Sequence, residues 1–375
     1  MAAVAIGWLV YERTGSAYNL GLIGLAQFVP MVLLTLPVGH IADRYDRRLI
    51  ACMGQFTQSA ALAFLAVGIV GGWLTTAHIF IAVVVQGAGR AFEAPTMSAL
   101  LPRLVPVNLL SRAIALASSA NQTATILGPA AGGLLYALGA AAPLGAAALL
   151  AALAGALTCF TRYERDAPAR VPATLRSIFS GISYIWSRPV VLGAVSLDLF
   201  AVLLGGATAL LPIYARDILL IGPWGMGLLR SGPAMGALAM SIVLSRMRLR
   251  HSVGRLMFGA VIAFGLATIV FALSRNLPLS LAALIATGAA DNVSVVIRSS
   301  LVQLSVPDGM RGRVSAVNSL FIGTSNQLGE FESGITAGLL GAVPAVLLGG
   351  VGTIAIALLW MRLFPALRNV ESLTD

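Results

Sequence analysis

Seven charged side chains stand inside apolar stretches of this sequence, where burial disfavours an unpaired charge. They are Arg90, Glu93, Asp198, Arg230, Asp291, Glu330 and Glu332. At the centre of a bilayer each would cost at least about 2.5–3.5 kcal/mol, so such residues usually pair or serve a function. Burial favours the neutral form of a carboxyl group, which can then bind and release a proton near neutral pH. Proton transfer is the chemistry that this set suggests.

Helical spacing indicates which of these charges can meet. Arg90 and Glu93 are three residues apart, so they can pair on one helix face. Asp291 and Arg298 are seven residues apart and also share a face. The competing interpretation is that such pairs only hold helices in register.

The two glutamates near the C-terminus cannot both face one cavity. Glu330 and Glu332 lie about 200° apart around a helix, so one of them should meet a neighbouring helix or a backbone donor. No arginine lies in their own apolar stretch, and we therefore favour Glu330 as the proton carrier. Glu93 and Asp198 are the alternatives. For Asp198, a purely structural pair with Arg230 is the competing interpretation.

Uncharged polar side chains in both halves of the chain are candidates for lining a cavity at the interface between two helical bundles. They are Gln27, Asn121, Gln122, Asn318, Ser325, Asn326 and Gln327. Aromatic residues make up only 7% of the chain, so the sequence gives no sign of a large stacking cage for a planar ligand.

The elements that must position these residues are apolar and long. Hydrophobic residues make up 58% of the chain and charged residues 10%, against about 25% charged in soluble domains. Runs of about 20 apolar residues, enough to cross about 30 Å of hydrocarbon, recur from end to end. The predicted spans are Leu20–Ile41, Leu49–Gly71, His78–Leu100, Ala113–Leu138, Pro143–Thr161, Val190–Tyr214, Trp224–Leu244, Leu256–Leu273, Leu277–Ile297, Val314–Leu340 and Val343–Leu363. The chain is therefore expected to be an all-α membrane protein.

A shorter apolar segment, Met1–Tyr11, precedes these spans. As a helix it would extend only about 16 Å, too little to cross a bilayer. It lacks the basic region and small-residue cleavage site of a signal peptide. We expect it to be the outer half of a first helix that is truncated at its N-terminus.

Arginine fixes the expected orientation. All 24 basic residues are arginine; nineteen, including Arg298, fall in alternate loops, three in the opposite set and two inside spans. The side rich in arginine is expected to be cytoplasmic, which places the C-terminus in the cytoplasm and predicts twelve transmembrane helices. Because these arginines form short clusters instead of one contiguous face, the net charge of +10 does not indicate nucleic-acid binding.

The longest hydrophilic connection, residues 162–189, divides the chain into an N-terminal bundle of six helices (1–161) and a C-terminal bundle of six (190–375). Apolar residues between Leu175 and Trp186 recur at helical spacing, which predicts an amphipathic helix on the cytoplasmic membrane surface. A plain linker is the alternative.

Cysteine and histidine do not indicate a metal site or cofactor. Cys52 and Cys159 lie in or beside apolar spans, so we interpret them as small buried residues instead of a disulfide. The three histidines are scattered, without a cysteine or carboxylate at metal-ligand spacing.

One short loop carries a distinctive pattern, GHIADRYDRR at Gly39–Arg48. It resembles the G-x-L-A-D-R-x-G-R-R/K signature of the major facilitator superfamily, with Asp46 in place of the usual glycine. The resemblance implies the fold of that superfamily and a cytoplasmic gate or latch, with Asp43 and Arg47 as its ion pair. The matching residues are Gly39, Asp43, Arg44, Arg47 and Arg48. The equivalent second-half loop, Ser245–Arg255, has arginines but no aspartate.

Two further segments refine the resemblance. ILGPAAGG, Ile126–Gly133, is similar to a motif that accompanies antiporting exporters, although Gly128, Pro129, Gly132 and Gly133 could equally be a helix-packing patch. The segment 290–334 resembles the branch that includes enterobactin exporters and drug or metabolite effluxers.

These features together favour proton-coupled efflux of a small organic molecule by alternating access. The expected setting is a bacterial inner membrane, with the lipid bilayer, protons and a small-molecule substrate as partners and a monomer as the working form. A membrane subunit of an ATP-driven complex and a non-transporting sensor or scaffold are the alternatives. With no lysine, the chain lacks a phosphate-binding Gly-Lys-Ser/Thr loop, which disfavours ATP hydrolysis by the chain itself. The sequence also shows no nucleophile–base pair or metal cluster, so we expect no enzymatic activity.

Overall fold

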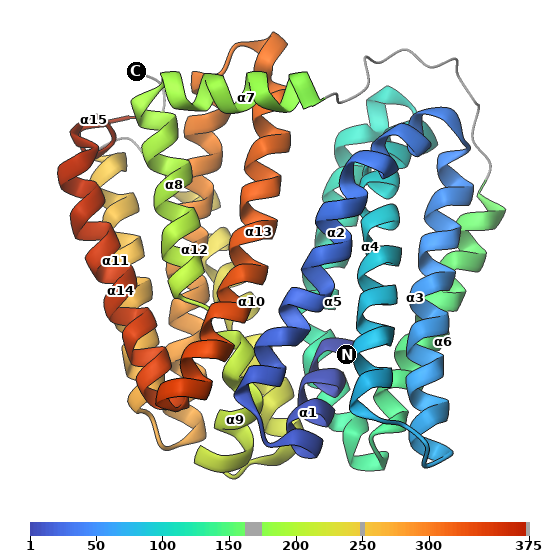
Figure 1. Ribbon diagram of the computed structural model, residues 1–375. Helices are drawn as coiled ribbons and strands as arrows, with labels where there is room; N and C mark the ends of the chain where they lie inside the picture. The colour runs from blue at the N-terminus through green and yellow to red at the C-terminus, as the bar shows by residue number, and fades with distance from the viewer. Residues whose placement is uncertain (162–174, 248–251, 373–375) are drawn as a thin grey trace. The chain divides into compact units, whose positions relative to one another are not determined.

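A computed structural model describes residues 1–161, 175–247 and 252–372, and every regular element in those ranges is helical (Figure 1). The longer helices are α1 (Ala2–Thr14), α2 (Ala17–Arg44), α3 (Arg47–Val70), α4 (Thr76–Leu104), α5 (Leu110–Leu135), α6 (Ala141–Phe160), α7 (Leu175–Ser187), α8 (Pro189–Leu204), α10 (Gly222–Arg246), α11 (Val253–Leu273), α12 (Leu277–Ser305), α13 (Asp308–Leu340) and α14 (Ala342–Leu363). Each predicted apolar span coincides with one of these helices. After α8, the span predicted to reach Tyr214 continues through short helical turns that include α9 (Leu211–Ile213).

Polar residues directly before the apolar runs start several helices. The Thr75 side chain and the His78 side chain exchange hydrogen bonds with each other's backbone N–H at the start of α4. Asn276 Oδ1 accepts a hydrogen bond from Leu279 N, 2.9 Å away, at the start of α12. Such caps satisfy backbone donors that have no partner within the helix.

Eight helical segments of the described residues are long and apolar enough to cross a membrane. Helices α4, α5 and α13 are not among them because they contain more polar residues, and α1 has only 13 residues. Large apolar side chains face outward along single helices. On α6, Leu149, Leu153, Leu157 and Phe160 are 56–82% exposed at helical spacing. A surface of this kind suits lipid and would be unfavourable in water.

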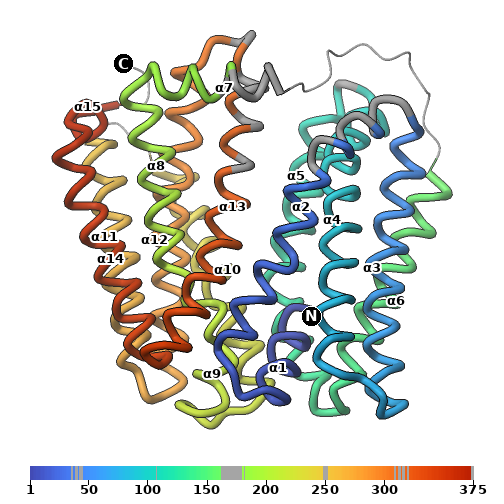
Figure 2. Tube along the Cα trace, viewed as in Figure 1, coloured from blue at the N-terminus to red at the C-terminus, as the bar shows by residue number. Residues whose placement is uncertain are grey.

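The chain divides into two compact units (Figure 2). The first contains residues 1–15 and 22–173, and the second contains residues 16–21 and 174–375. In the first unit α3 packs against both α4 and α6. In the second unit α12 packs against α10 and α11, and α8 packs against α13 and α14.

Small residues bring the backbones of α3 and α4 into direct contact. A Cβ atom added to Gly54 would lie 2.7 Å from the Gly89 carbonyl oxygen, and one added to Gly89 would lie 2.8 Å from the Gly54 carbonyl oxygen. Neither separation is possible for a real side chain, so this crossing requires glycine on both helices.

The predicted amphipathic segment forms the helix α7, while residues 162–174 of the predicted linker lie outside the described part of the chain. Ile185 is buried, whereas Trp186 is 72% exposed. The Tyr184 hydroxyl donates a hydrogen bond to the Ser305 carbonyl oxygen, 2.8 Å away at the end of α12. Contact with the membrane surface stays a prediction for this helix.

Candidate functional site

The second unit encloses a cavity of about 210 Å³ between α8, α10, α11, α12 and α13. Its wall is mostly apolar, with Phe264 and Phe271 among the larger side chains. Its polar residues are Thr208, Thr268, Thr287, Asp291, Asn326 and Glu330. The structure therefore brings together three residues that the sequence singled out on two different helices, Asp291 on α12 and Asn326 and Glu330 on α13.

Glu330 meets an arginine from another helix. Arg230 Nη2 on α10 lies 4.0 Å from Glu330 Oε1, and both side chains are about a quarter exposed (27% and 26%). The expectation that Glu330 lacks an arginine partner is therefore wrong. It considered only arginines in the same span, whereas the partner comes from a helix about 100 residues earlier. At 4.0 Å and this exposure, such an ion pair contributes only about 0–1 kcal/mol to stability.

Asp198 is paired tightly, but with a different arginine from the one proposed. Arg298 Nη1 donates to Asp198 Oδ2 at 2.6 Å, and the two side chains are 2% and 5% exposed. Arg298 thus binds Asp198 on α8 instead of Asp291 on its own helix, and Arg230 does not pair with Asp198. The sequence placed Arg298 in a cytoplasmic loop because the apolar run ends at Ile297; α12 continues to Ser305 and keeps Arg298 buried.

Glu332 has a local partner. The Thr336 hydroxyl, one turn later on α13, donates to Glu332 Oε1 at 2.8 Å, and the Ser333 hydroxyl lies 3.5 Å from Oε2. Glu332 does not line the cavity that Glu330 lines. The predicted separation of the two glutamates holds, but the partner of Glu332 is a hydroxyl group of its own helix.

In the first unit, Glu93 is held by two amides instead of Arg90. Gln55 Nε2 donates to Glu93 Oε1 at 3.0 Å, and Gln58 Nε2 donates to Glu93 Oε2 at 2.5 Å. Arg90 is exposed, and within the described residues no ion pair joins it to Glu93. Both glutamines come from α3, next to the Gly54 crossing, so interhelical packing placed them where sequence spacing on α4 could not show them.

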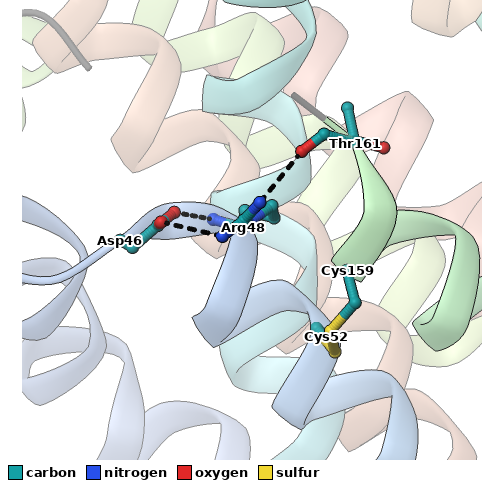
Figure 3. Close-up of polar contacts among 5 residues, drawn as sticks. All are labelled: Asp46, Arg48, Cys52, Cys159 and Thr161. Atoms are coloured by element: carbon teal, nitrogen blue, oxygen red, sulfur yellow. Dashed lines mark hydrogen bonds and ion pairs between the residues drawn. A yellow bond between two sulfur atoms is a disulfide. The ribbon is translucent and has the colours of Figure 1, made fainter. Parts of the chain in front are cut away.

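The signature loop is described in part (Figure 3). The Asp46 side chain caps α3 by accepting a hydrogen bond from Arg48 N at 2.9 Å. Arg48 Nη2 lies 3.6 Å from Asp46 Oδ2, and its Nη1 donates to the Thr161 carbonyl oxygen at 3.2 Å. The residue that departs from the superfamily signature therefore has a capping role. The surroundings of Gly39 and the side chains of Asp43 and Arg44 lie outside the described part of the structure. The Asp43–Arg47 latch therefore stays a prediction.

A disulfide joins Cys52 on α3 to Cys159 on α6, with their Cα atoms 5.8 Å apart (Figure 3). The interpretation of both cysteines as isolated small residues is wrong. The two positions are 107 residues apart, and only the packing of α3 against α6 brings them together.

The glycine cluster of α5 permits close packing within the first unit. A Cβ atom on Gly132 would lie 2.7 Å from Met1 Cα, and Gly132 and Gly133 are both buried. Pro129 lies inside the helix. This contact supports the packing interpretation of the cluster and leaves its association with antiport untested.

Near the charged cluster, the sequence showed no sign of one side chain, Ser294, and did not predict the burial of another, Arg298. Ser294 and the Arg298 guanidinium are almost fully buried, and the Ser294 Oγ and Arg298 Nε atoms have no hydrogen-bond partner. A serine in an apolar helix gives no sequence signal, and Arg298 was assigned to a loop. Among the described residues, no group of histidine, cysteine or acidic side chains is arranged to hold a metal ion.

Comparison with known proteins identifies the class of this arrangement. The family model described as "Transmembrane secretion effector", a branch of the major facilitator superfamily, matches residues 1–374. The chain is 27% identical to the multidrug efflux pump Tap of Mycolicibacterium fortuitum, covering 93% of this chain and 90% of that protein. It is 23% identical to the enterobactin exporter EntS of Citrobacter koseri over 98% and 89% of the two chains. A variant of the nucleoside transporter NupG has the same fold, with a TM-score of 0.77, 13% identity and coverage of 96% and 94%.

Proposed function

Because the chain belongs to the transmembrane secretion effector family of the major facilitator superfamily, and is an efflux-type membrane transporter and not an enzyme, we propose that it exports a small organic molecule in exchange for protons. The observation that carries this proposal is the cavity with Asp291 and Glu330 in its wall. Carboxyl groups in an apolar cavity can exchange protons, and the same groups can bind a cationic cargo.

The lining of the cavity favours a particular chemistry of cargo. Apolar side chains such as Phe264 and Leu284 suit an apolar body, and two carboxyl groups suit a basic nitrogen. The relatives named as multidrug and enterobactin exporters act on organic molecules of different kinds. We propose that the cargo is an amphipathic organic compound. A drug, a siderophore and a metabolite are the candidate classes.

Alternating access supplies the mechanism in this proposal. Two bundles of six helices would alternate between states open to either side of the membrane, with the loop at 39–48 as a cytoplasmic latch that breaks and re-forms. The bias of arginine towards alternate loops supports a cytoplasmic C-terminus in a bacterial inner membrane. Arg298 lies in α12 and no longer counts as a loop residue. The bias remains, because eighteen arginines are left in that set of loops against three in the opposite set.

Flux across proteoliposomes tests the proposal. The purified full chain is reconstituted, and movement of ethidium, erythromycin and enterobactin is measured with an imposed pH gradient, then with ATP and magnesium but no gradient. Flux that follows the pH gradient and ignores ATP is the expected result. Flux that requires ATP and a partner subunit would instead support the membrane-subunit alternative.

The remaining alternative, a sensor or scaffold, predicts no flux of any of the three compounds under either condition. Empty liposomes and liposomes with a heat-inactivated chain provide the background rate. The transport proposal is rejected if the reconstituted chain does not exceed that background.

A further inference from the structure

A second, much smaller cavity lies beside the buried ion pair of the second unit. Its volume is about 10 Å³, and its polar lining consists of Asp198, Asp291 and Ser294. A volume of roughly 10–15 Å³ on this measure holds one water molecule. The rest of the lining is apolar, so a water molecule here could find polar partners only among these three side chains.

The side chains around this small cavity have unused hydrogen-bonding capacity. Ser294 is 3% exposed, and its Oγ atom has no partner, although a hydroxyl group can both donate and accept. Buried polar groups of this kind are usually satisfied by a protein group or by an ordered water. The orphaned hydroxyl therefore points to an occupant that both donates and accepts hydrogen bonds, as water does.

Charge is unbalanced at the same place. Asp198 and Asp291 carry two acidic groups, and Arg298 supplies one guanidinium, which is bound to Asp198 at 2.6 Å. The excess carboxylate is thus Asp291. One bound proton would neutralise it.

The helices packed around Asp291 bring few other charges. From α10 comes Arg230 and from α13 comes Glu330, and these two side chains form an ion pair with each other. From α8 comes Asp198, which is bound to Arg298. The basic residue of α11, Arg255, lies in its first turn.

Asp291 lies between the two cavities. It lines both of them, as do the apolar residues Val202 and Phe264, whereas Glu330 lines only the larger cavity and Asp198 only the smaller one. A proton that enters the larger cavity can therefore reach Asp291 without passing through the buried ion pair.

We infer that Asp291 is a proton-holding site distinct from Glu330, completed by Ser294 and a single water molecule beside the Asp198–Arg298 pair. The proton forms an O–H bond with an Asp291 carboxylate oxygen and leaves by the same cavity when that bond breaks. Asp198 stays ionised and fixes Arg298. A role for this site in transport rests on the proposed proton coupling, whereas its ability to hold a proton does not.

Chemical labelling tests the inference without a transport assay. Dicyclohexylcarbodiimide reacts with protonated carboxyl groups in apolar surroundings, and mass spectrometry of the wild-type chain locates the adduct. We expect an adduct at Asp291 that increases as the pH is lowered, and no adduct at Asp198. The adduct at Asp291 should persist in Glu330→Gln and disappear in Asp291→Asn. The adduct itself is located in the unaltered chain, so that part of the result does not depend on whether either variant folds.

Two outcomes would overturn the inference. The first is the absence of an adduct at Asp291 at every pH while Glu330 or Asp217 reacts. The second is protection of Asp291 by sodium ions but not by choline, which would assign the site to a metal cation. If Asp291 reacts as expected but flux ignores the pH gradient, the proton-holding site stands and the proposed function fails.

Discussion

In the first unit, Glu93 accepts hydrogen bonds from two neutral amides, whereas in the second unit Asp198 and Glu330 face guanidinium groups. The amides of Gln55 and Gln58 satisfy a carboxylate without neutralising it. In the second unit, arginines pair with Asp198 and Glu330, whereas none of the ion pairs in the described residues includes Asp291. The contrast shows that acidic residues which look alike in the sequence can have different contacts. Glu93 joins two helices, Asp198 anchors Arg298, and Asp291 and Glu330 line a cavity in which we propose that protons are exchanged.

The largest expected effect is the loss of the buried ion pair. Asp198→Ala leaves the Arg298 guanidinium buried without a counter-charge and should lower the free energy of unfolding by about 3–5 kcal/mol. Thermal unfolding in detergent, followed by tryptophan fluorescence, measures the change. The matched control is Asp217→Ala, because Asp217 pairs with Arg216 at 3.8 Å on an exposed surface and should contribute about 0–1 kcal/mol. Equal effects of the two substitutions would contradict the distinction between buried and exposed pairs.

The next prediction concerns proton coupling in the second unit. Glu330→Gln keeps the size of the side chain but removes its titratable proton, so gradient-driven ethidium flux should fall by about tenfold or more. Facilitated movement without a gradient should be retained. Efflux that still collapses normally with the proton gradient would show that Glu330 is not the coupling residue.

The Glu93→Gln substitution tests the carboxylate of the first unit against Glu330 of the second unit. The substituted amide keeps an acceptor oxygen for one of the two glutamines, so we expect gradient-driven flux to change by no more than about threefold and stability by about 1–3 kcal/mol. Flux and thermal unfolding are measured beside Glu330→Gln under one set of conditions. A larger loss of proton coupling in Glu93→Gln than in Glu330→Gln would reverse the roles that we assign to the two units.

The smallest effect is expected for Gln55→Leu. Gln55 is 5% exposed, and its Oε1 atom already lacks a partner, so removing the amide loses one hydrogen bond and relieves one unsatisfied acceptor. The net change in the free energy of unfolding should be about 0.5–1.5 kcal/mol, since Gln58 still binds Glu93. Loss of more than this in thermal unfolding would mean that Gln55 has a contact beyond the carboxylate.

The helices were more predictable than their contacts, and the reason is physical. Hydropathy and capping residues are local, so the run beginning near Leu49 was recognised as a span and begins as α3 at Arg47. The opposite failure occurred at Arg298: a charge normally ends an apolar run, and nothing local indicated that Asp198, 100 residues earlier, would keep that charge inside α12.

The sequence indicated some residues of the cavity but not its position. Asp291 and Glu330 were singled out as charges inside apolar spans and Asn326 as a polar neighbour, and all three line a cavity within the second unit. A cavity at the interface of the two bundles stays a prediction. The partners of the charged residues were not anticipated, because a helix that is apolar on every side gives no periodic signal of its rotation. The disulfide and the amides around Glu93 depend on that rotation in the same way.

Two contacts in the first unit link three of its helices, and we expect these helices to move together as a rigid body. Backbone contact at Gly54 and Gly89 joins α3 to α4, and the bond between Cys52 and Cys159 joins α3 to α6. A spin label or fluorophore on the exposed end of any one of these helices would therefore report the displacement of all three. Distance measurements during turnover then need only one label site in this part of the protein, and a second site on α6 would serve as an internal check that the three helices move without bending.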